Sequence, residues 1–88
     1  MAKVLMYSTA VCPYCIRAEQ LLKRKGVHEV EKLRVDLQPE LRMEMVKQTG
    51  RRTVPQIYVN DVYIGGYDDL ASLDHAGGLD ELLSRSGF

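Results

Sequence analysis

The length and charge of the chain limit it to one small domain with no general attraction to polyanions. Its 88 residues leave room for a single domain spanning 1–88, and 12 basic against 12 acidic residues argue against nucleic acid or an anionic membrane as a partner. The opening residues show no signal-peptide pattern, and no apolar run approaches the ~20 residues that span a bilayer. We therefore expect a cytoplasmic protein, in which a structural disulfide would be unusual.

The first third of the chain predicts a strand, a helix and a second strand. Residues 3–7 are apolar on both faces, as in a central strand, and residues 30–36 predict another strand of less certain register. Between them, residues 13–26 predict a helix that begins with a proline and ends at a glycine. The side chains expected to face the core from this helix are Ile16, Leu21 and Leu22. This order and size are typical of a βαβ unit.

The rest of the chain predicts another helix, a hairpin and a helical tail. Residues 39–50 predict a helix whose inner face is formed by Leu41, Met45 and Val46. Residues 56–60 and 62–65 predict two short strands around a tight turn, and the tail from Asp68 is helical with a break at Gly77-Gly78. The expected fold class is therefore α/β, a four-stranded mixed sheet flanked by helices in the order βαβαββα.

Cys12 and Cys15 are the only cysteines, and three kinds of chemistry compete for them. A structural zinc site needs four ligands, and the only histidines, His28 and His75, do not have motif spacing. An inert disulfide across so short a loop would remove little unfolded-state entropy. Thiol–disulfide chemistry is therefore the favoured interpretation.

The position of the pair at a strand–helix junction assigns a role to each sulfur. Cys12 should lie exposed at the helix N-terminus, where free N–H groups and the helix dipole stabilise a thiolate, and Cys15 should lie one turn in and be more covered. The helix end alone lowers the pKa of a thiol by about one unit, so other groups must contribute as well. Arg17 and Lys23 are candidates on the same helix, and Tyr14 would form an aromatic wall beside the nucleophile.

Two later segments add to this pattern, although each also has an ordinary structural explanation. Val54-Pro55 stands directly before a strand, where a cis proline would leave the backbone of Val54 free to pair with a peptide, or where a simple turn would do. Gly65-Gly66 followed by Asp68 and Asp69 predicts a turn and a helix cap, which would also suit a carboxylate ligand. Arg51-Arg52 is either a solvated pair or an anion site.

Three motifs in this order resemble the classical dithiol glutaredoxins, and the small bacterial members in particular. They are "CPYC" after the first strand, "TVP" before the third and "GGYDDL" at the start of a late helix, and the resemblance covers essentially the whole chain. It implies a thioredoxin-like fold and an enzyme that reduces protein disulfides and glutathione mixed disulfides. Glutathione would be the cosubstrate, with no tightly bound cofactor and no metal.

The resemblance also implies a role for individual residues. Cys12 corresponds to the nucleophile and Cys15 to the resolving cysteine. The residues implied to bind glutathione are Tyr14, Arg51, Arg52, Thr53, Val54, Pro55, Gly66, Tyr67, Asp68 and Asp69. Many family members carry a lysine shortly before the first cysteine, whereas residues 8–11 contain no cation here. Either an arginine of the 51–52 pair compensates, or glutathione binds more weakly and the pKa of Cys12 falls less, and we expect a modest loss of rate.

Three other functions compete with this interpretation. Electrons could come from a thioredoxin reductase instead of glutathione, or Cys12 and glutathione could hold a [2Fe–2S] cluster between two subunits, which Pro13 and Cys15 argue against. A non-catalytic binding module would leave the paired cysteines without a purpose. The expected protein partners are disulfide-bonded or glutathionylated proteins, with ribonucleotide reductase as one candidate, and the chain is expected to act as a monomer.

Overall fold

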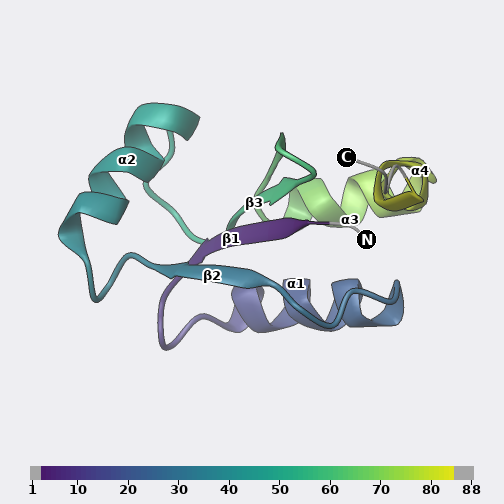
Figure 1. The fold of residues 1–88 in the computed structure, drawn as a ribbon, viewed down its shortest axis with the longest axis horizontal. Helices are drawn as coiled ribbons and strands as arrows, with labels where there is room; N and C mark the ends of the chain where they lie inside the picture. The colour runs from purple at the N-terminus through teal and green to yellow at the C-terminus, as the bar shows by residue number, and fades with distance from the viewer. Residues whose placement is uncertain (1–2, 85–88) are drawn as a thin grey trace.

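The computed structural model describes residues 3–84, which form a four-stranded sheet between two layers of helices (Figure 1). The elements in chain order are β1 (Val4–Ser8), α1 (Pro13–Arg24), β2 (Glu31–Arg34), α2 (Pro39–Thr49), β3 (Gln56–Val59), β4 (Val62–Gly65), α3 (Tyr67–His75) and α4 (Gly78–Ser84). The strand order is β2-β1-β3-β4, with β1 parallel to β2 and antiparallel to β3, and with β3 antiparallel to β4. The predicted α/β class and mixed four-stranded sheet are confirmed.

β1 is a central strand, as its apolar sequence predicts, and its alternating side chains enter two separate cores. Val4 and Met6 pack with α1 and α3 on one face of the sheet, whereas Tyr7 packs with Val35 and Met45 on the α2 face. Figure 1 shows α1 and α2 on opposite sides of the sheet. Burial on both faces explains why this strand has no polar side in its middle.

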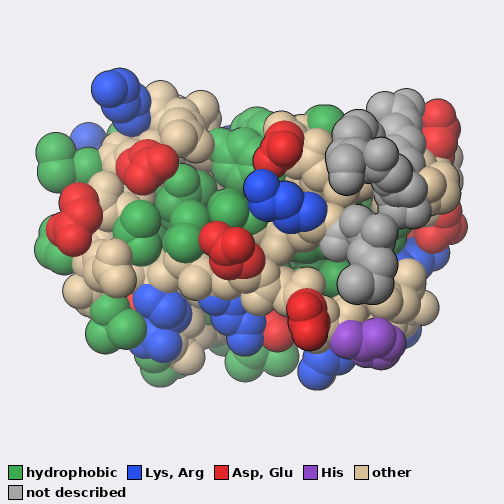
Figure 2. Space-filling view, in the orientation of Figure 1, with side chains coloured by type: hydrophobic (Ala, Val, Ile, Leu, Met, Phe, Trp, Pro, Cys, Tyr) green, Lys and Arg blue, Asp and Glu red, His purple; other side chains and the backbone are tan. Residues whose placement is uncertain are grey.

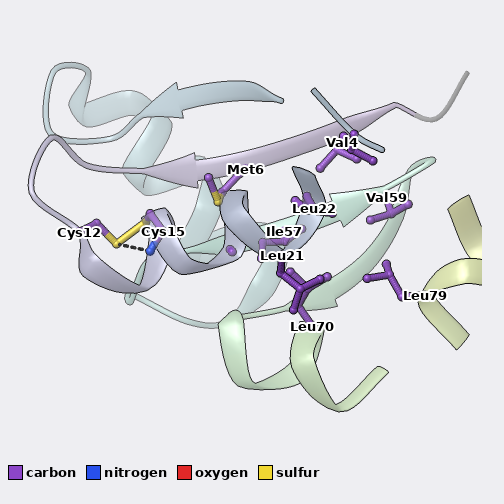
Figure 3. Close-up of a cluster of buried hydrophobic side chains, with 12 residues drawn as sticks. Val4, Met6, Cys12, Cys15, Leu21, Leu22, Ile57, Val59, Leu70 and Leu79 are labelled. Atoms are coloured by element: carbon purple, nitrogen blue, oxygen red, sulfur yellow. Dashed lines mark hydrogen bonds between the residues drawn. A yellow bond between two sulfur atoms is a disulfide. The ribbon is translucent and has the colours of Figure 1, made fainter. Parts of the chain in front are cut away.

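The larger core lies between the sheet and the two helices α1 and α3 (Figure 3). From α1 it receives Cys15, Ala18, Leu21 and Leu22, which recur at helical spacing on one side of the helix. Ile16 was expected on this face, and that prediction is wrong because its side chain is 55% exposed. At about 100° per residue, the position after Cys15 is turned away from the buried stripe.

α2 covers the other face of the sheet with few side chains. Met45 is its only buried residue in the described structure, while Leu41 and Val46 are half-buried and pack against the same small cluster. The predicted inner face is thus confirmed, with Met45 at its centre. Gly50 ends α2 in the left-handed conformation at φ 74°, which glycine adopts without steric cost.

The hairpin and the split tail also agree with the sequence. Asn60 and Asp61 form the turn between β3 and β4 with φ values of 50° and 67°, as in a primed hairpin turn. The tail is broken into α3 and α4 near Gly77-Gly78, and Lys25 at the end of α1 pairs with Asp74 of α3 at 2.8 Å. Within residues 3–84, no helix is both long and apolar enough to cross a membrane.

Candidate active site

Cys12 and Cys15 are joined by a disulfide at the N-terminus of α1 (Figure 3). Cys12 is the N-cap residue, Pro13 occupies the first helical turn, and the backbone N–H of Cys15 donates a hydrogen bond of 3.1 Å to Cys12 Sγ. A side-chain acceptor at the N-cap is the usual partner of the free N–H groups of a first turn. Here that acceptor is a sulfur, so the helix end acts on Cys12 directly.

Both cysteines are buried, and the expectation of an exposed Cys12 is wrong for this oxidised state. Cys12 is 7% exposed and Cys15 is 4% exposed. The Cys12 sulfur is bonded to Cys15 and turned toward its N–H, so both residues join the larger core. Large hydrophobic side chains exposed at this end of the helix include Val11 and Tyr14.

A groove of about 360 Å³ has Tyr14 in its wall, and Tyr14 stands between Cys12 and Cys15 in the sequence. Its lining residues are Tyr14, Arg51, Thr53, Val54, Pro55, Gln56, Gly66, Tyr67, Asp68 and Asp69. The fold therefore brings together every residue that the sequence suggested for glutathione except Arg52, which lines a different cavity beside α2. Three distant segments of the chain meet here, from α1, from the loop before β3 and from the start of α3.

The loop before β3 carries a cis peptide bond between Val54 and Pro55, which confirms that prediction. Val54 packs against both hydrophobic cores, so its side chain is anchored. Among the described residues, no hydrogen bond uses the backbone N–H or C=O of Val54. This backbone is therefore available to an extended ligand lying in the groove.

Gln56 is a residue of this groove that sequence reasoning missed. Its side chain is almost fully buried, and its Nε2 donates to the Thr53 carbonyl oxygen at 2.9 Å and to Thr53 Oγ1 at 3.3 Å. Tyr63 Oη donates to Gln56 Oε1 at 2.6 Å. Gln56 therefore holds the Thr53 end of the loop in place. A glutamine at the start of an otherwise apolar strand was the available signal.

Asp69 closes one end of the groove by binding to two segments at once. Its Oδ2 accepts hydrogen bonds from Arg51 Nη1 at 2.8 Å and from the backbone N–H of Gly66 at 2.9 Å. Hydrogen bonds from the Arg51 guanidinium and then from the Gly66 N–H hold the pKa of Asp69 below its usual value, while burial acts against them. Asp68, the next acidic side chain in this turn, is exposed to solvent.

Gly65 is required by the position of the Asp69 carboxylate. Its φ of +122° is a conformation that side chains rarely adopt, and a Cβ there would lie on the Asp69 carboxyl group, 2.7 Å from its Cγ. At Gly66, by contrast, a Cβ would meet the Pro55 carbonyl oxygen at 3.5 Å, an ordinary contact. Of the two glycines, Gly65 is therefore the one that the groove requires.

Arg17 and Lys23, the two candidate cations on α1, differ in their distance from the N-terminus of the helix. The Arg17 guanidinium lies 5.3 Å from the centroid of the Tyr14 ring, and Tyr14 lies 6.0 Å from the ring of Tyr67. Arg17 thus supports the aromatic wall of the groove. Lys23 lies in the last turn of α1, about 16 Å along the helix from Cys12 at 1.5 Å per residue, too far to act on it.

The loop before Cys12 is fastened by a carboxylate, not by a cation. Asp36 Oδ2 accepts a hydrogen bond from the backbone N–H of Ala10 at 3.2 Å, and Arg34 donates to both Asp36 oxygens at 2.8 and 2.7 Å. Arg34, with a smaller contribution from Ala10, holds the pKa of Asp36 well below its usual value. Within residues 3–84, no group of His, Cys, Asp and Glu side chains could hold a metal ion.

Comparisons with known proteins agree with this arrangement. A model of the glutaredoxin family matches residues 4–64. The chain is 52% identical over 84 residues to a glutaredoxin of Pseudomonas aeruginosa, covering 96% of this chain and 99% of that one. It is 51% identical over 83 residues to glutaredoxin 3 of Escherichia coli K12, covering 94% and 99%.

Solved structures confirm the thioredoxin-like fold that the resemblance implied. The solution structure of glutaredoxin from Brucella melitensis is 44% identical, with a TM-score of 0.83 and coverage of 100% of this chain and 95% of that one. A buckwheat glutaredoxin–glutathione complex is 24% identical, with a TM-score of 0.87 and coverage of 96% and 78%. At that identity the buckwheat structure supports the fold alone.

Proposed function

The chain belongs to the glutaredoxin family and is a glutathione-dependent thiol–disulfide oxidoreductase, and we propose that it reduces protein disulfides and glutathionylated proteins through Cys12. The observation that carries this proposal is the juxtaposition of the Cys12–Cys15 pair with a groove that offers an unpaired backbone, an aromatic wall and a helix N-terminus. Glutathione is the cosubstrate, the protein acts in the cytoplasm as a monomer, and no tightly bound cofactor is involved.

Cys12 is the nucleophile because the helix end acts on its sulfur. In the reduced protein, the Cys15 N–H that donates to Cys12 Sγ would stabilise the thiolate, and the absence of acidic residues from the first turn of α1 leaves that charge unopposed. Because a thiolate, not a thiol, attacks a disulfide, a lower pKa increases the reactive fraction at neutral pH. Cys15 takes the role of the resolving thiol.

The reaction proceeds by successive thiol–disulfide exchanges. The Cys12 thiolate attacks one sulfur of a protein disulfide, forming a mixed disulfide and releasing the other sulfur as a thiolate. The Cys15 thiolate then attacks Cys12 Sγ, which frees the reduced substrate and leaves the Cys12–Cys15 disulfide. A glutathione thiolate attacks Cys12 Sγ and releases Cys15. A second glutathione attacks the bound glutathione sulfur, giving glutathione disulfide and the Cys12 thiolate, which the helix N-terminus would stabilise as a leaving group.

Glutathione is proposed to lie along the groove as an extended tripeptide. The backbone of Val54 would pair with its cysteine residue, and Tyr14 would cover the sulfur end. The N-terminus of α3, with Gly66, Tyr67 and Asp68, would hold the γ-glutamyl end. These assignments, and those of Thr53, Pro55 and Asp69 as lining residues, are carried over from the family and supported by the shared groove.

Arg51 is the better candidate of the two arginines for the glycine carboxylate. It lines the groove and uses Nη1 for Asp69, which leaves other guanidinium N–H groups for a ligand. Arg52 would need to leave its own cavity beside α2 to reach the same place. We therefore propose Arg51 as the carboxylate ligand.

The test compares wild type, Cys15→Ser and Cys12→Ser in a disulfide reduction assay coupled to glutathione reductase and NADPH. We expect Cys12→Ser to be inactive on every substrate. Cys15→Ser should still reduce glutathionylated peptides and lose most activity on an intramolecular protein disulfide, because only the latter needs a resolving thiol. Activity of Cys12→Ser, or NADPH oxidation that needs thioredoxin reductase instead of glutathione, would overturn the proposal.

A further inference from the structure

The outer face of α2 carries a second groove, separate from the one beside the cysteines. A cavity of about 630 Å³ lies over this face, lined by Pro39, Arg42, Met43, Val46, Lys47 and Arg52. The five helical positions follow the i, i+3, i+4, i+7, i+8 spacing of one side of a helix. We call this cavity the α2 groove.

Of the apolar side chains of the α2 groove, Val46 is half-buried against the smaller core, whereas Pro39 and Met43 are exposed. Met43 is 73% exposed, and Leu37, just before the helix, is 66% exposed, whereas Met45 on the opposite side of α2 is fully buried. In Figure 2, hydrophobic side chains reach the surface at the left edge of the molecule, over α2, with both basic and acidic side chains beside them. Clustered exposure of this kind is typical of a surface that binds a partner.

The rim of the α2 groove is positively charged. It contains Arg42, Lys47 and Arg52, and among residues 3–84 no salt bridge involves any of the three. Arg42 Nη1 donates only to the Arg52 carbonyl oxygen, at 3.3 Å. The acidic residues of α2 lie outside the lining, and Glu44 contributes to another cavity. An apolar floor with unpaired cations around it is complementary to an apolar side chain flanked by carboxylates.

The α2 groove adjoins the proposed glutathione groove along the chain. Arg51 lines the glutathione groove and Arg52 lines the α2 groove, so the two grooves meet at these consecutive residues. We propose that the α2 groove binds a segment of the protein substrate in which an apolar side chain is flanked by Asp or Glu. This inference rests on the proposed function, because the same substrate would present its disulfide to Cys12.

The size and charge of the α2 groove favour a peptide segment over a membrane. The longest dimension of the molecule is 33 Å, which about ten extended residues span at roughly 3.3 Å each, so one substrate segment can reach both grooves. Three cations and one small apolar patch would hold the protein only weakly on an anionic bilayer. The formal charge of zero for the whole chain adds no further attraction.

The experiment uses two glutathionylated peptides that differ only in charge. One carries a leucine flanked by glutamates about four to ten residues from the modified cysteine, and the other carries lysines in place of the glutamates. Deglutathionylation is measured with wild type, with Lys47→Glu and with Met43→Ser. Lys23→Glu makes the same charge change in the last turn of α1, and Val62→Ser removes another exposed apolar side chain, so these two are the matched controls.

We expect Lys47→Glu to raise KM for the acidic peptide roughly threefold to tenfold, with kcat unchanged, because a favourable charge pair becomes a repulsive one. Met43→Ser should also raise KM, whereas Lys23→Glu and Val62→Ser should not. A small disulfide substrate should be turned over equally by all five proteins. Equal KM values for both peptides in every variant would overturn the α2 groove proposal and leave the proposed function intact.

Direct binding separates the two proposals if turnover fails. A fluorescent acidic peptide without cysteine is titrated into Cys12→Ser and into Cys12→Ser with Lys47→Glu, followed by fluorescence anisotropy. Binding that the Lys47 change weakens supports the α2 groove even where glutathione supports no turnover. Absence of binding overturns it, as does equal binding by both proteins. Affinity for phosphatidylserine vesicles is measured by cosedimentation. An affinity for the vesicles higher than that for the peptide would also overturn the proposal, since the surface would then be a membrane site.

Discussion

The two sides of the Cys12–Cys15 disulfide are built in different ways. On the groove side, Arg51, Asp69 and Gly66 are linked by hydrogen bonds of 2.8 and 2.9 Å, and the buried Gln56 holds Thr53. On the loop side, residues 9–11 are partly or fully exposed and are tied to the rest of the fold by Asp36. The difference indicates that this protein preorganises the side proposed to bind glutathione and leaves the side that precedes Cys12 open.

This contrast also bears on the missing lysine. A cation in the loop would act on the sulfur and on the ligand together, through charge alone. Here the groove side contributes backbone groups and a carboxylate-bound arginine, and the loop contributes no cation. Recognition of glutathione is therefore expected to survive in this protein, while the depression of the Cys12 pKa depends on the helix end.

Gly65→Ala should break the groove side and have the largest effect on stability. The substitution forces a side chain into a positive φ conformation, which costs about 1–3 kcal/mol, and adds a collision with the Asp69 carboxylate. We expect a clear drop in the urea midpoint together with a higher KM for glutathione. Gly26→Ala is the matched control, because Gly26 has φ +89° and nothing within 4 Å of an added Cβ. Equal losses for the two variants would contradict the close fit of Gly65 against Asp69.

Thr9→Lys should restore a cation to the loop side. We expect the Cys12 pKa in the reduced protein to fall by about half a unit to one unit, with a corresponding gain in rate at neutral pH. The pKa is read from the pH dependence of iodoacetamide alkylation in a Cys15→Ser background. Thr9→Gln provides a side chain of similar length without charge and should leave the pKa unchanged. A pKa that does not move in Thr9→Lys would show that the loop is too far from the sulfur to matter.

Asp69→Asn tests the charge within the groove side through its pH dependence. In the folded protein, Arg51 and Gly66 lower the pKa of Asp69. The charged carboxylate therefore stabilises the fold at pH values above the pKa of an unfolded aspartate, about 3.9. This contribution is lost as the pH falls through the lower pKa of the folded state. Wild type should exceed the variant by less than about 1 kcal/mol at pH 7, given the partial exposure of the pair.

The same pair of proteins is then unfolded in urea at a series of pH values. The stability difference should be constant down to about pH 5 and should shrink below about pH 4. Asp68→Asn removes the neighbouring exposed carboxylate and should change stability little at either pH. A difference that persists unchanged at pH 2 would mean that packing, not charge, explains the role of Asp69.

Asp36→Asn should have the smallest effect, confined to the loop side. The amide side chain still accepts a hydrogen bond from Ala10, while the charge that binds Arg34 is lost. We expect faster hydrogen exchange at the Ala10 amide with little change in global stability, since the Arg34 and Asp36 side chains are 34% and 30% exposed and solvent weakens the pair. Asp61→Asn, which removes the exposed Lys3–Asp61 pair elsewhere, should leave Ala10 unchanged. Protection of Ala10 equal to wild type would exclude Asp36 as the tether of the loop.

The sequence alone determined the order of elements and the chemistry of the cysteines. Apolar runs and glycine or proline boundaries predict local structure through interactions between near neighbours, which is why Pro13, Gly50 and the Asn60-Asp61 turn are placed correctly. Cys12 and Cys15 are separated by about one turn of helix, which is a local relationship, so their pairing could also be predicted from the sequence.

Contacts between distant segments were decided by the tertiary structure. Which arginine faces the groove depends on how the chain turns after α2, and adjacent positions such as Arg51 and Arg52 point into different hollows. What packs against each side chain likewise decides that Cys12 is buried and Ile16 exposed. It also decides that Gln56 donates a hydrogen bond to Thr53. A one-residue step turns a side chain by about 100° on a helix or by half a turn on a strand, so small local shifts change its partner entirely.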